Sequence, residues 1–225
     1  MCAERARVAL SWSGGKDAAW ALHRLRGSPG VEVVALVTTV VSAFGRVAMH
    51  GVRAELVRAQ ARAAGIELVE VPLSWPSTNA EYEQRVGAAL AELRRGLGVT
   101  HVAFGDLFLE DVRAYRERML EGTGLTPLFP LWLEPTGRLM ETMLSGGVEA
   151  RIVCLDPQRV QWELAGRALD AGLLADLPVA VDPCGERGEF HTFVTAGPML
   201  SEPVRVAPGE IVEREGFVYA DLLPV

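Results

Sequence analysis

Residues 11–17, Ser-Trp-Ser-Gly-Gly-Lys-Asp, separate an apolar run at residues 8–10 from a helix-like stretch at residues 18–25. Glycines in such a turn let backbone N–H groups point at an anion, and the following helix N-terminus adds a partial positive charge. Lys16 is the single lysine among 22 Lys and Arg residues. Its compact ammonium can enter a phosphate-binding turn that a planar guanidinium would crowd. The sequence therefore predicts an anion-binding loop between a strand and a helix.

Two common phosphate loops do not fit this stretch. The P-loop pattern requires a glycine where the chain has Leu10, and Ser or Thr where it has Asp17. The dinucleotide pattern G-x-G-x-x-G is also absent. The pattern S-G-G-K-D at residues 13–17 instead resembles the phosphate loop of the N-type ATP pyrophosphatases. Those enzymes cleave ATP between its α- and β-phosphates, usually to adenylate a substrate. A Gly-Gly turn with a chance lysine is the alternative.

Composition limits the class of protein. A chain of 225 residues can form one large domain or two small ones, and 49% hydrophobic residues are enough for a packed core. A net charge of −7 argues against general binding to nucleic acid or to anionic membranes, although a local basic groove stays open.

Cysteine usage and the apolar runs bear on location. Cys2, Cys154 and Cys184 are odd in number and far apart, which disfavours a disulfide scaffold or a structural zinc site and suits a reducing cytoplasm. The first seven residues are too charged for a signal peptide, and no run approaches the ~20 apolar residues of a membrane helix. We therefore expect a cytoplasmic protein without a membrane partner.

Strands and helices alternate through the first half of the chain. Strands are expected at residues 6–12, 31–41, 67–71 and 101–104, and helices at 16–27, 51–64 and 77–97. Thr78 and Glu81 form a candidate capping box for the last of these helices. Such alternation predicts a doubly wound parallel sheet. Its ligand-binding edge would gather the loops at 13–17, 38–50 and 105–111, with Ser11 and Thr38 at the strand ends.

The pattern changes after residue 121. Residues 126–132 look like an irregular apolar segment, followed by a helix at 135–144, a strand at 148–155 and a helix at 159–171. Short strand-like runs separated by Gly or Pro turns continue from residue 183 to the end. We predict an α/β domain at residues 1–123 and a smaller α+β domain at residues 124–225.

Two stretches of the first domain are candidates for ligand contacts. In M-H-G-V-R at residues 49–53, Arg53 and nearby N–H groups could meet a phosphate, or Arg53 could be an exposed residue at a helix start. In F-G-D-L-F-L-E-D-V-R at residues 104–113, Gly105 permits close backbone approach, and Asp106 or Asp111 could hold Mg²⁺ on ATP phosphates. A polar turn before a helix is the alternative for this second stretch.

A third stretch, C-G-E-R-G-E-F-H-T-F at residues 184–193, gathers Glu186, Glu189 and His191 in a Gly-rich turn. In an extended strand Glu189, His191 and Phe193 would share one face. The cluster could act in acid–base chemistry, orient an amine or bind a cation. Its spacing matches none of the usual zinc patterns. A lone histidine would favour a structural role, but this cluster favours a function.

Taken together, the chain resembles the diphthine–ammonia ligase family, a branch of the N-type ATP pyrophosphatases. The resemblance rests on the three stretches above, on S-G-G-K-D at residues 13–17 and on T-P-L-F-P-L-W at residues 126–132. It implies a HUP-type α/β domain followed by a family-specific domain. It also implies that ATP adenylates a carboxylate, here that of diphthine on elongation factor 2, and that ammonia then attacks the acyl-AMP.

The resemblance also implies roles for particular residues. The catalytic residues would be Lys16, Glu186, Glu189 and His191. Mg²⁺ would be held through ATP by Asp17, Asp106 and Asp111. The ATP-binding residues would be Ser11, Ser13, Gly14, Gly15, Lys16, Asp17, Thr38, His50, Arg53, Gly105 and Asp106.

Some features depart from the family pattern. The superfamily loop often continues with serine, where this chain has Ala18, so one hydroxyl near the phosphates is missing. The M-H-G-V-R segment is similar to a bacterial-type subgroup, and bacteria do not make diphthamide. Adenylation of another acid, action on tRNA and non-catalytic nucleotide binding therefore stay as alternatives, although the chain lacks the paired cysteines and basic surface of a tRNA sulfur transferase. A homodimer is also left open.

Overall fold

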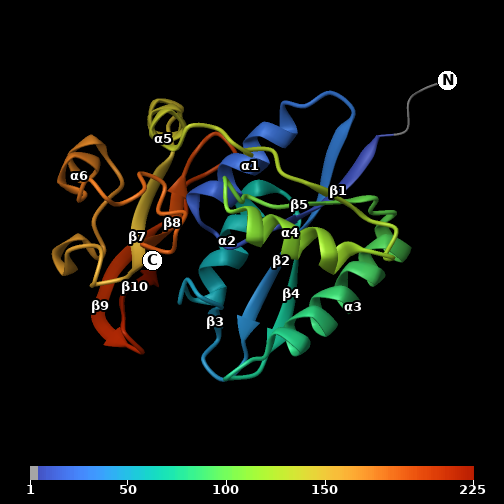
Figure 1. Ribbon diagram of the computed structural model, residues 1–225, viewed down its shortest axis with the longest axis horizontal. Coiled ribbons are helices and arrows are strands. Elements are labelled where there is room, and N and C mark those ends of the chain that lie inside the picture. The colour runs from blue at the N-terminus through green and yellow to red at the C-terminus, as the bar shows by residue number, and fades with distance from the viewer. Residues whose placement is uncertain (1–4) are drawn as a thin grey trace.

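The computed structural model describes residues 5–225, so Cys2 lies outside the described part of the chain. Its first sheet contains six strands: β1 (Ala6–Ser11), β2 (Val31–Val41), β3 (Arg46–Val47), β4 (Glu67–Leu73), β5 (His101–Ala103) and β6 (Thr126–Leu128). Four helices connect them: α1 (Lys16–Arg26), α2 (Ala54–Ala64), α3 (Asn79–Leu97) and α4 (Glu110–Leu120). Figure 1 shows these elements around the sheet. The expected alternation of strands and helices is confirmed.

The first sheet is mostly parallel, in the order β4-β2-β1-β5-β6. The short strand β3 is antiparallel to β2 and pairs with Val40 and Val41, beyond the end of β1. Leu10 of β1 lies between Leu36 of β2 and Ala103 of β5. From β1 the chain first builds the sheet on one side, through β2 and β4, and then crosses to the other side, through β5 and β6. The ligand-binding edge of this HUP-type sheet is therefore centred on the carboxyl end of β1, where the strand order reverses.

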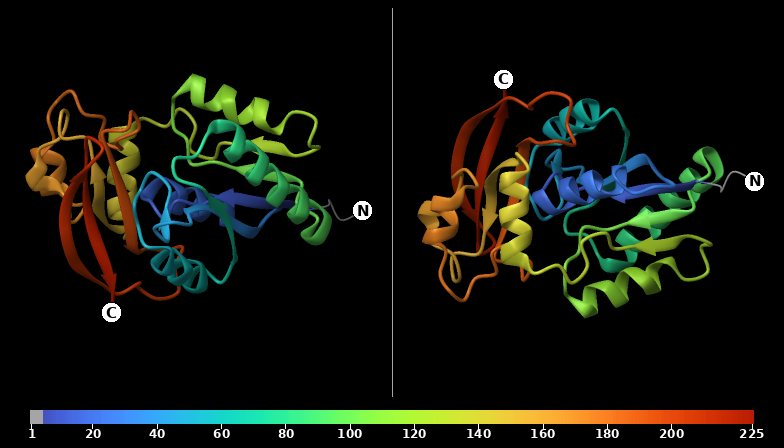
Figure 2. Two further views of the ribbon diagram at one scale, coloured as in Figure 1. Left: turned by 90° about the horizontal axis from the view of Figure 1, so that it is seen from below. Right: turned by 90° about the horizontal axis from the view of Figure 1, so that it is seen from above.

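Alternate residues of the central strands belong to two different cores. Val8 and Leu10 pack with helices α1 and α2, whereas Ala9 packs with residues of α3 and α4. This alternation follows from the period of two in a strand, and it explains why the central strands are apolar on both faces. Figure 2 shows α3 and α4 on one side of the sheet and α2 on the other.

Residues 135–225 form a second, smaller unit with a four-stranded antiparallel sheet in the order β8-β7-β10-β9. Its strands are β7 (Glu149–Leu155), β8 (Phe190–Ala196), β9 (Val206–Arg214) and β10 (Phe217–Pro224). Its helices are α5 (Thr136–Ser145), the 3₁₀ turn η1 (Trp162–Leu164) and α6 (Ala171–Asp176). The core around α1 and α2 continues into this sheet through residues such as Phe190, Phe193 and Val194.

Several expected elements differ from the observed ones. The expected helix at residues 159–171 is wrong, because the chain makes only the 3₁₀ turn η1, adopts a positive φ of 79° at Gly166, and pairs Ala168 with Arg151. Residues 126–128 are not irregular, since they pair in parallel with β5 as strand β6. The separation of the two domains between residues 123 and 124 stays a prediction. Within residues 5–225, no helix has both the length and the apolar character needed to cross a membrane.

The start of α3 confirms half of the expected capping box. The Thr78 hydroxyl accepts a hydrogen bond from the Glu81 amide at 3.2 Å, which satisfies one of the free N–H groups of the first turn. The Glu81 carboxylate does not return to Thr78, because it accepts the Ser74 amide at 3.0 Å instead. Glu81 therefore joins the loop after β4 to the first turn of α3.

Candidate functional site

The glycine-rich loop leads from the end of β1 into α1, with Gly15 as the helix N-cap. Gly14 has a φ of +80°, and a Cβ there would lie 2.7 Å from Gln60 Oε1. A Cβ on Gly15 would lie 3.1 Å from the carbonyl oxygen of Thr192. The Ser13 hydroxyl accepts the Gly15 amide at 3.3 Å. Backbone conformation and close packing therefore both favour glycine at position 14, whereas at position 15, where φ is −82°, only the close packing does.

Strand β8 of the second unit lies directly against this loop. The Val194 amide donates to the Gly14 carbonyl at 2.9 Å, and the Lys16 amide donates to the Thr192 hydroxyl at 3.1 Å. These bonds join segments that are about 180 residues apart in the sequence, as the numbering shows. The second unit therefore contacts the glycine-rich loop directly. The sequence of residues 11–17 alone could not indicate this contact.

Gln60 of α2 bridges the glycine-rich loop and β8. It was not predicted as a site residue. Its Oε1 accepts the Trp12 indole N–H at 3.1 Å. Its Nε2 donates to the carbonyls of Gly14 at 3.0 Å and Val194 at 2.6 Å. The side chain is completely buried. One feature of the sequence could have indicated Gln60. Leu56, Gln60 and Ala64 share one face of the helix, so Gln60 is a polar residue within an apolar stripe.

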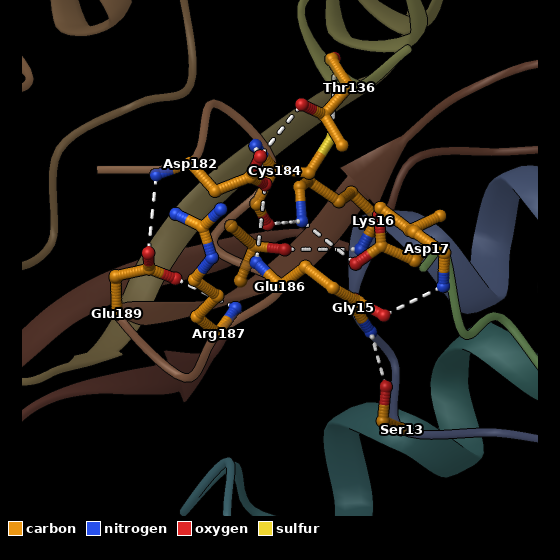
Figure 3. A network of polar contacts seen from close by, with 12 residues as sticks. Ser13, Gly15, Lys16, Asp17, Thr136, Asp182, Cys184, Glu186, Arg187 and Glu189 are labelled. Atoms are coloured by element: carbon orange, nitrogen blue, oxygen red, sulfur yellow. Dashed lines mark hydrogen bonds and ion pairs between the residues drawn. The ribbon is translucent and has the colours of Figure 1, made fainter. Parts of the chain in front are cut away.

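Lys16 lies inside the protein, with only 2% of its surface exposed, at the junction of the two units (Figure 3). Its Nζ donates to Asp17 Oδ2 at 2.8 Å and to the carbonyl oxygen of Cys184. Burial is the largest single effect and lowers the pKa of Lys16, but Asp17, Cys184 and Glu186 together outweigh it, so the pKa lies above its ordinary value. The ammonium therefore stays charged at neutral pH, and it supplies fixed positive charge behind the loop.

Three carboxyl groups beside the loop interact with one another. Burial raises the pKa of Asp17 against the opposing effect of Lys16, and burial together with Asp17 raises the pKa of Asp106. Glu186 accepts the Leu107 amide at 2.7 Å, while burial and the charges of Asp17 and Asp106 raise the pKa of Glu186 to about 7. Glu186 can therefore exchange a proton near neutral pH.

Glu186 should make folding stability pH-dependent. Its folded pKa is raised, so between about pH 4.5 and about pH 7 the native protein retains a proton that the unfolded chain has lost, and the free energy of unfolding falls as pH rises. Glu186→Gln cannot ionise, so it removes this pH-dependent fall in the free energy of unfolding. The free energy of unfolding of the variant relative to wild type should therefore be larger at about pH 8 than at about pH 5. Urea unfolding at both pH values measures it. Glu141→Gln, exposed on α5, is the control. A stability difference between Glu186→Gln and wild type that does not grow with pH would contradict the raised pKa of Glu186.

Two histidines meet beside the loop. The rings of His50 and His191 are 4.4 Å apart between centroids, although they come from different units. Desolvation and the neighbouring His191 lower the pKa of His50 well below its ordinary value. Desolvation and Lys16 lower the pKa of His191 to about 4. Both imidazoles are therefore neutral at pH 7 and can donate or accept one hydrogen bond without adding charge.

Glu189 and Arg53 make contacts away from this centre. Glu189 precedes β8 and accepts the amides of Asp182 at 3.2 Å and Arg187 at 2.8 Å, as Figure 3 shows, so it holds the turn and does not continue the strand face expected for it. Arg53 donates to Asp221 Oδ2 at 2.7 Å. Burial opposes ionisation of Asp221, but its hydrogen bonds with arginines lower the pKa of Asp221 to about 2.

A cavity of about 620 Å³ opens beside the loop at the sheet edge. Three buried polar atoms of its lining residues have no hydrogen-bond partner, namely Thr38 Oγ1, His50 Nδ1 and Arg116 Nε. Such atoms are expected to bind a ligand or water. The predicted site residues that line the cavity are Ser11, Ser13, Thr38, His50 and Asp111. Of the other predicted residues, Arg53 contacts Asp221 of β10 and Glu189 holds the turn before β8, while the rest lie around the loop.

Two carboxylate oxygens fit the expected Mg²⁺. Asp17 Oδ1 and Asp106 Oδ2 are buried without a hydrogen-bond partner, although Asp106 Oδ2 forms a long ion pair of 3.6 Å with Arg116 Nε, and carboxylate oxygen is the preferred ligand of this ion. Gly105 brings the two segments together, since a Cβ there would lie 3.0 Å from the Ala18 amide nitrogen. Across residues 5–225, no three or more His, Cys, Asp or Glu residues form a ready-made metal cluster. Any ion here would therefore also need ligands from ATP or water.

A glycine-rich anion loop at the centre of a parallel sheet edge defines an α/β protein of the nucleotide-binding type. The family model for the diphthamide synthase N-terminal domain matches residues 6–127, and that for the diphthamide synthase C-terminal domain matches residues 135–221. The chain therefore belongs to the diphthamide synthase family. Membership indicates an ATP-using enzyme of the ligase kind. No curated protein matches the chain.

Proposed function

We propose that the protein is an AMP-forming carboxylate–ammonia ligase. A carboxylate oxygen attacks the α-phosphorus of ATP, the bond to the β-phosphate breaks, and pyrophosphate leaves. Ammonia then attacks the acyl carbon of the acyl-AMP, which yields the amide and AMP with loss of one proton. The buried ammonium of Lys16 behind the glycine-rich loop is the observation that most supports this proposal, because charge develops on the departing pyrophosphate.

The surrounding groups support each step. The loop amides and Lys16 would stabilise the pyrophosphate, and the polar lining atoms of Thr38 and His50 would bind the nucleotide. Mg²⁺ bound with ATP, held by Asp17 and Asp106, would neutralise part of the phosphate charge. Glu186 would accept the proton released when ammonia attacks, since its pKa of about 7 suits a base at neutral pH.

The family match supports diphthine on elongation factor 2 as the acid, with another carboxylic acid as the alternative. His191 would face the acyl-adenylate together with Glu186, because its ring lies 4.4 Å from that of His50 beside the loop. The remaining predicted roles, of Glu189 in catalysis, of Arg53 in phosphate binding and of Asp111 in metal binding, receive less support from the contacts described above.

Acid-dependent exchange between ATP and labelled pyrophosphate tests this function. We expect exchange only when a suitable acid is present, and AMP with pyrophosphate as products once ammonia is added. Elongation factor 2 carrying diphthine is the first acid to test, with mass spectrometry used to detect conversion of the carboxylate into the amide. Formation of ADP and phosphate would contradict the proposal, as would tight ATP binding without exchange for every acid tested.

A further inference from the structure

The M-H-G-V-R stretch belongs to a closed loop at residues 46–53, here called the histidine loop. Its two ends lie side by side, because Arg46 and Arg53 form an antiparallel β-bridge. Its tip reaches the glycine-rich loop, since a Cβ on Gly15 would lie 3.4 Å from His50 Nε2. The position of the histidine loop therefore determines where the His50 ring lies beside the phosphate-binding turn.

Strand β10 of the second unit contacts the histidine loop at two points. A Cβ on Gly51 would lie 2.7 Å from the Tyr219 ring, so this ring packs directly on the loop backbone. Asp221 accepts a hydrogen bond from Arg46 Nη1 at 2.8 Å and from Arg53 Nη2 at 2.7 Å. The same Arg46 Nη1 donates to the Gly51 carbonyl at 2.7 Å. One carboxylate therefore ties both ends of the histidine loop to the second sheet.

The donors of Arg53 face this carboxylate and not the cavity. Its Nε and Nη2 both donate to Asp221, and its Nη1 lies 3.9 Å from Glu55 Oε1. The Asp221 side chain is only 16% exposed, so the ion pair is better shielded from water than a surface pair. His50 lines the cavity, whereas Arg46 and Arg53 do not. These contacts favour a role in placing the histidine loop over direct contact with a phosphate.

The tip of the histidine loop has a backbone that needs outside support. Met49 adopts a positive φ of 66°, which is unfavourable for a residue with a side chain, and the His50 amide turns back to the Ala48 carbonyl at 2.8 Å. Such a conformation persists only where the surrounding structure holds it. The contacts with Tyr219 and Asp221 supply that support from the second sheet.

We propose that Asp221 is a positioning residue for the nucleotide site. By holding Arg46 and Arg53 it fixes the histidine loop, and so places His50 beside the phosphate-binding turn. Arg53 acts through this ion pair and does not bind a phosphate. The second sheet thereby shapes the nucleotide site through a contact outside the cavity. The inference rests on the proposed function for one assignment, that of the nucleotide to the cavity.

A double-mutant cycle separates positioning from phosphate binding, with a non-hydrolysable ATP analogue and Mg²⁺ titrated into the full chain. Asp221→Asn and Arg53→Gln should each raise the dissociation constant about two- to thirtyfold, the range found for residues that act on a site through others. The double variant should bind no more weakly than Asp221→Asn alone, because both changes remove the same contact. Glu213→Gln, at an exposed acid of β9, is the matched control and should bind like wild type.

Direct phosphate binding by Arg53 gives a different pattern in the same cycle. Arg53→Gln would then weaken binding of the analogue, while Asp221→Asn would leave it unchanged. That pattern would overturn the inference. It would also be overturned if the two effects were additive, or if neither substitution affected binding.

The ring signals of the histidines give a second readout that needs no nucleotide. The chain has four histidines, namely His23, His50, His101 and His191. In the NMR spectrum of the free protein, Asp221→Asn should shift the signals of His50, because its ring moves relative to that of His191. The signals of His101 on β5 should stay unchanged.

Unchanged signals of His50 would contradict the positioning role. Shifts of all four histidines would contradict it as well, since Asp221 would then support the whole fold and not the histidine loop. Failure of wild type to bind the ATP analogue would contradict the proposed function instead, and the NMR comparison would still decide the role of Asp221.

Discussion

Replacement of Lys16 by methionine is expected to lower acid-dependent ATP–pyrophosphate exchange about a hundred- to a thousandfold, the usual effect of removing one preorganised donor from a site of developing charge. Methionine preserves the length of the side chain and removes only the ammonium. The loss should appear mainly in kcat, because the positive charge matters most when pyrophosphate departs. Exchange measured per folded protein, with the folded fraction taken from circular dichroism, gives the comparison.

The same substitution should destabilise the protein by about 3 kcal/mol, because it leaves Asp17 and the Cys184 carbonyl without their buried cationic partner. Arg24→Met on α1 is the matched control. Arg24 is exposed and pairs with Glu134 at the surface, so its replacement should cost no more than about 1 kcal/mol and should not affect exchange. If Lys16→Met retained wild-type exchange, Lys16 would be a structural residue and the charge-stabilising role would be wrong.

Local sequence patterns predicted the first sheet well. The β2 strand is mostly apolar and β-branched, and the start of α3 is marked by Thr78, whose hydroxyl caps the helix. These features depend on neighbours within a few residues. The expected helix at residues 159–171 failed because tertiary pairing of Ala168 with Arg151 outweighed helical spacing. The strand β6 was missed because three residues with a proline carry little strand signal.

The site was predicted only in part, for a related reason. The glycines and Lys16 were recognisable because the loop is contiguous. The groups that hold it come from distant segments: Gln60 from α2, Thr192 from β8 and the carbonyl of Cys184. A carbonyl has no sequence signature at all. Arg116 was missed because a single arginine on a helix indicates nothing until the fold places it in the lining of the cavity.

A substitution at Gln60 tests most directly whether contacts from distant segments hold the glycine-rich loop in place. Gln60→Met keeps the volume of the side chain but leaves the Trp12 indole N–H and the Val194 carbonyl without the partners that Gln60 supplies. The Gly14 carbonyl keeps the Val194 amide. Each of these two buried unpaired groups costs about 1–3 kcal/mol, so we expect the free energy of unfolding to fall by about 2–6 kcal/mol.

Urea unfolding followed by circular dichroism measures this loss, with Gln84→Met as the matched control on the exposed face of α3. The control should differ from wild type by less than about 0.5 kcal/mol. We also expect Gln60→Met to weaken binding of ATP more than Gln84→Met does, because Gln60 connects the loop at Gly14 to strand β8. If Gln60→Met were as stable as wild type and bound ATP equally well, the second unit would not depend on Gln60 to hold the phosphate loop in place.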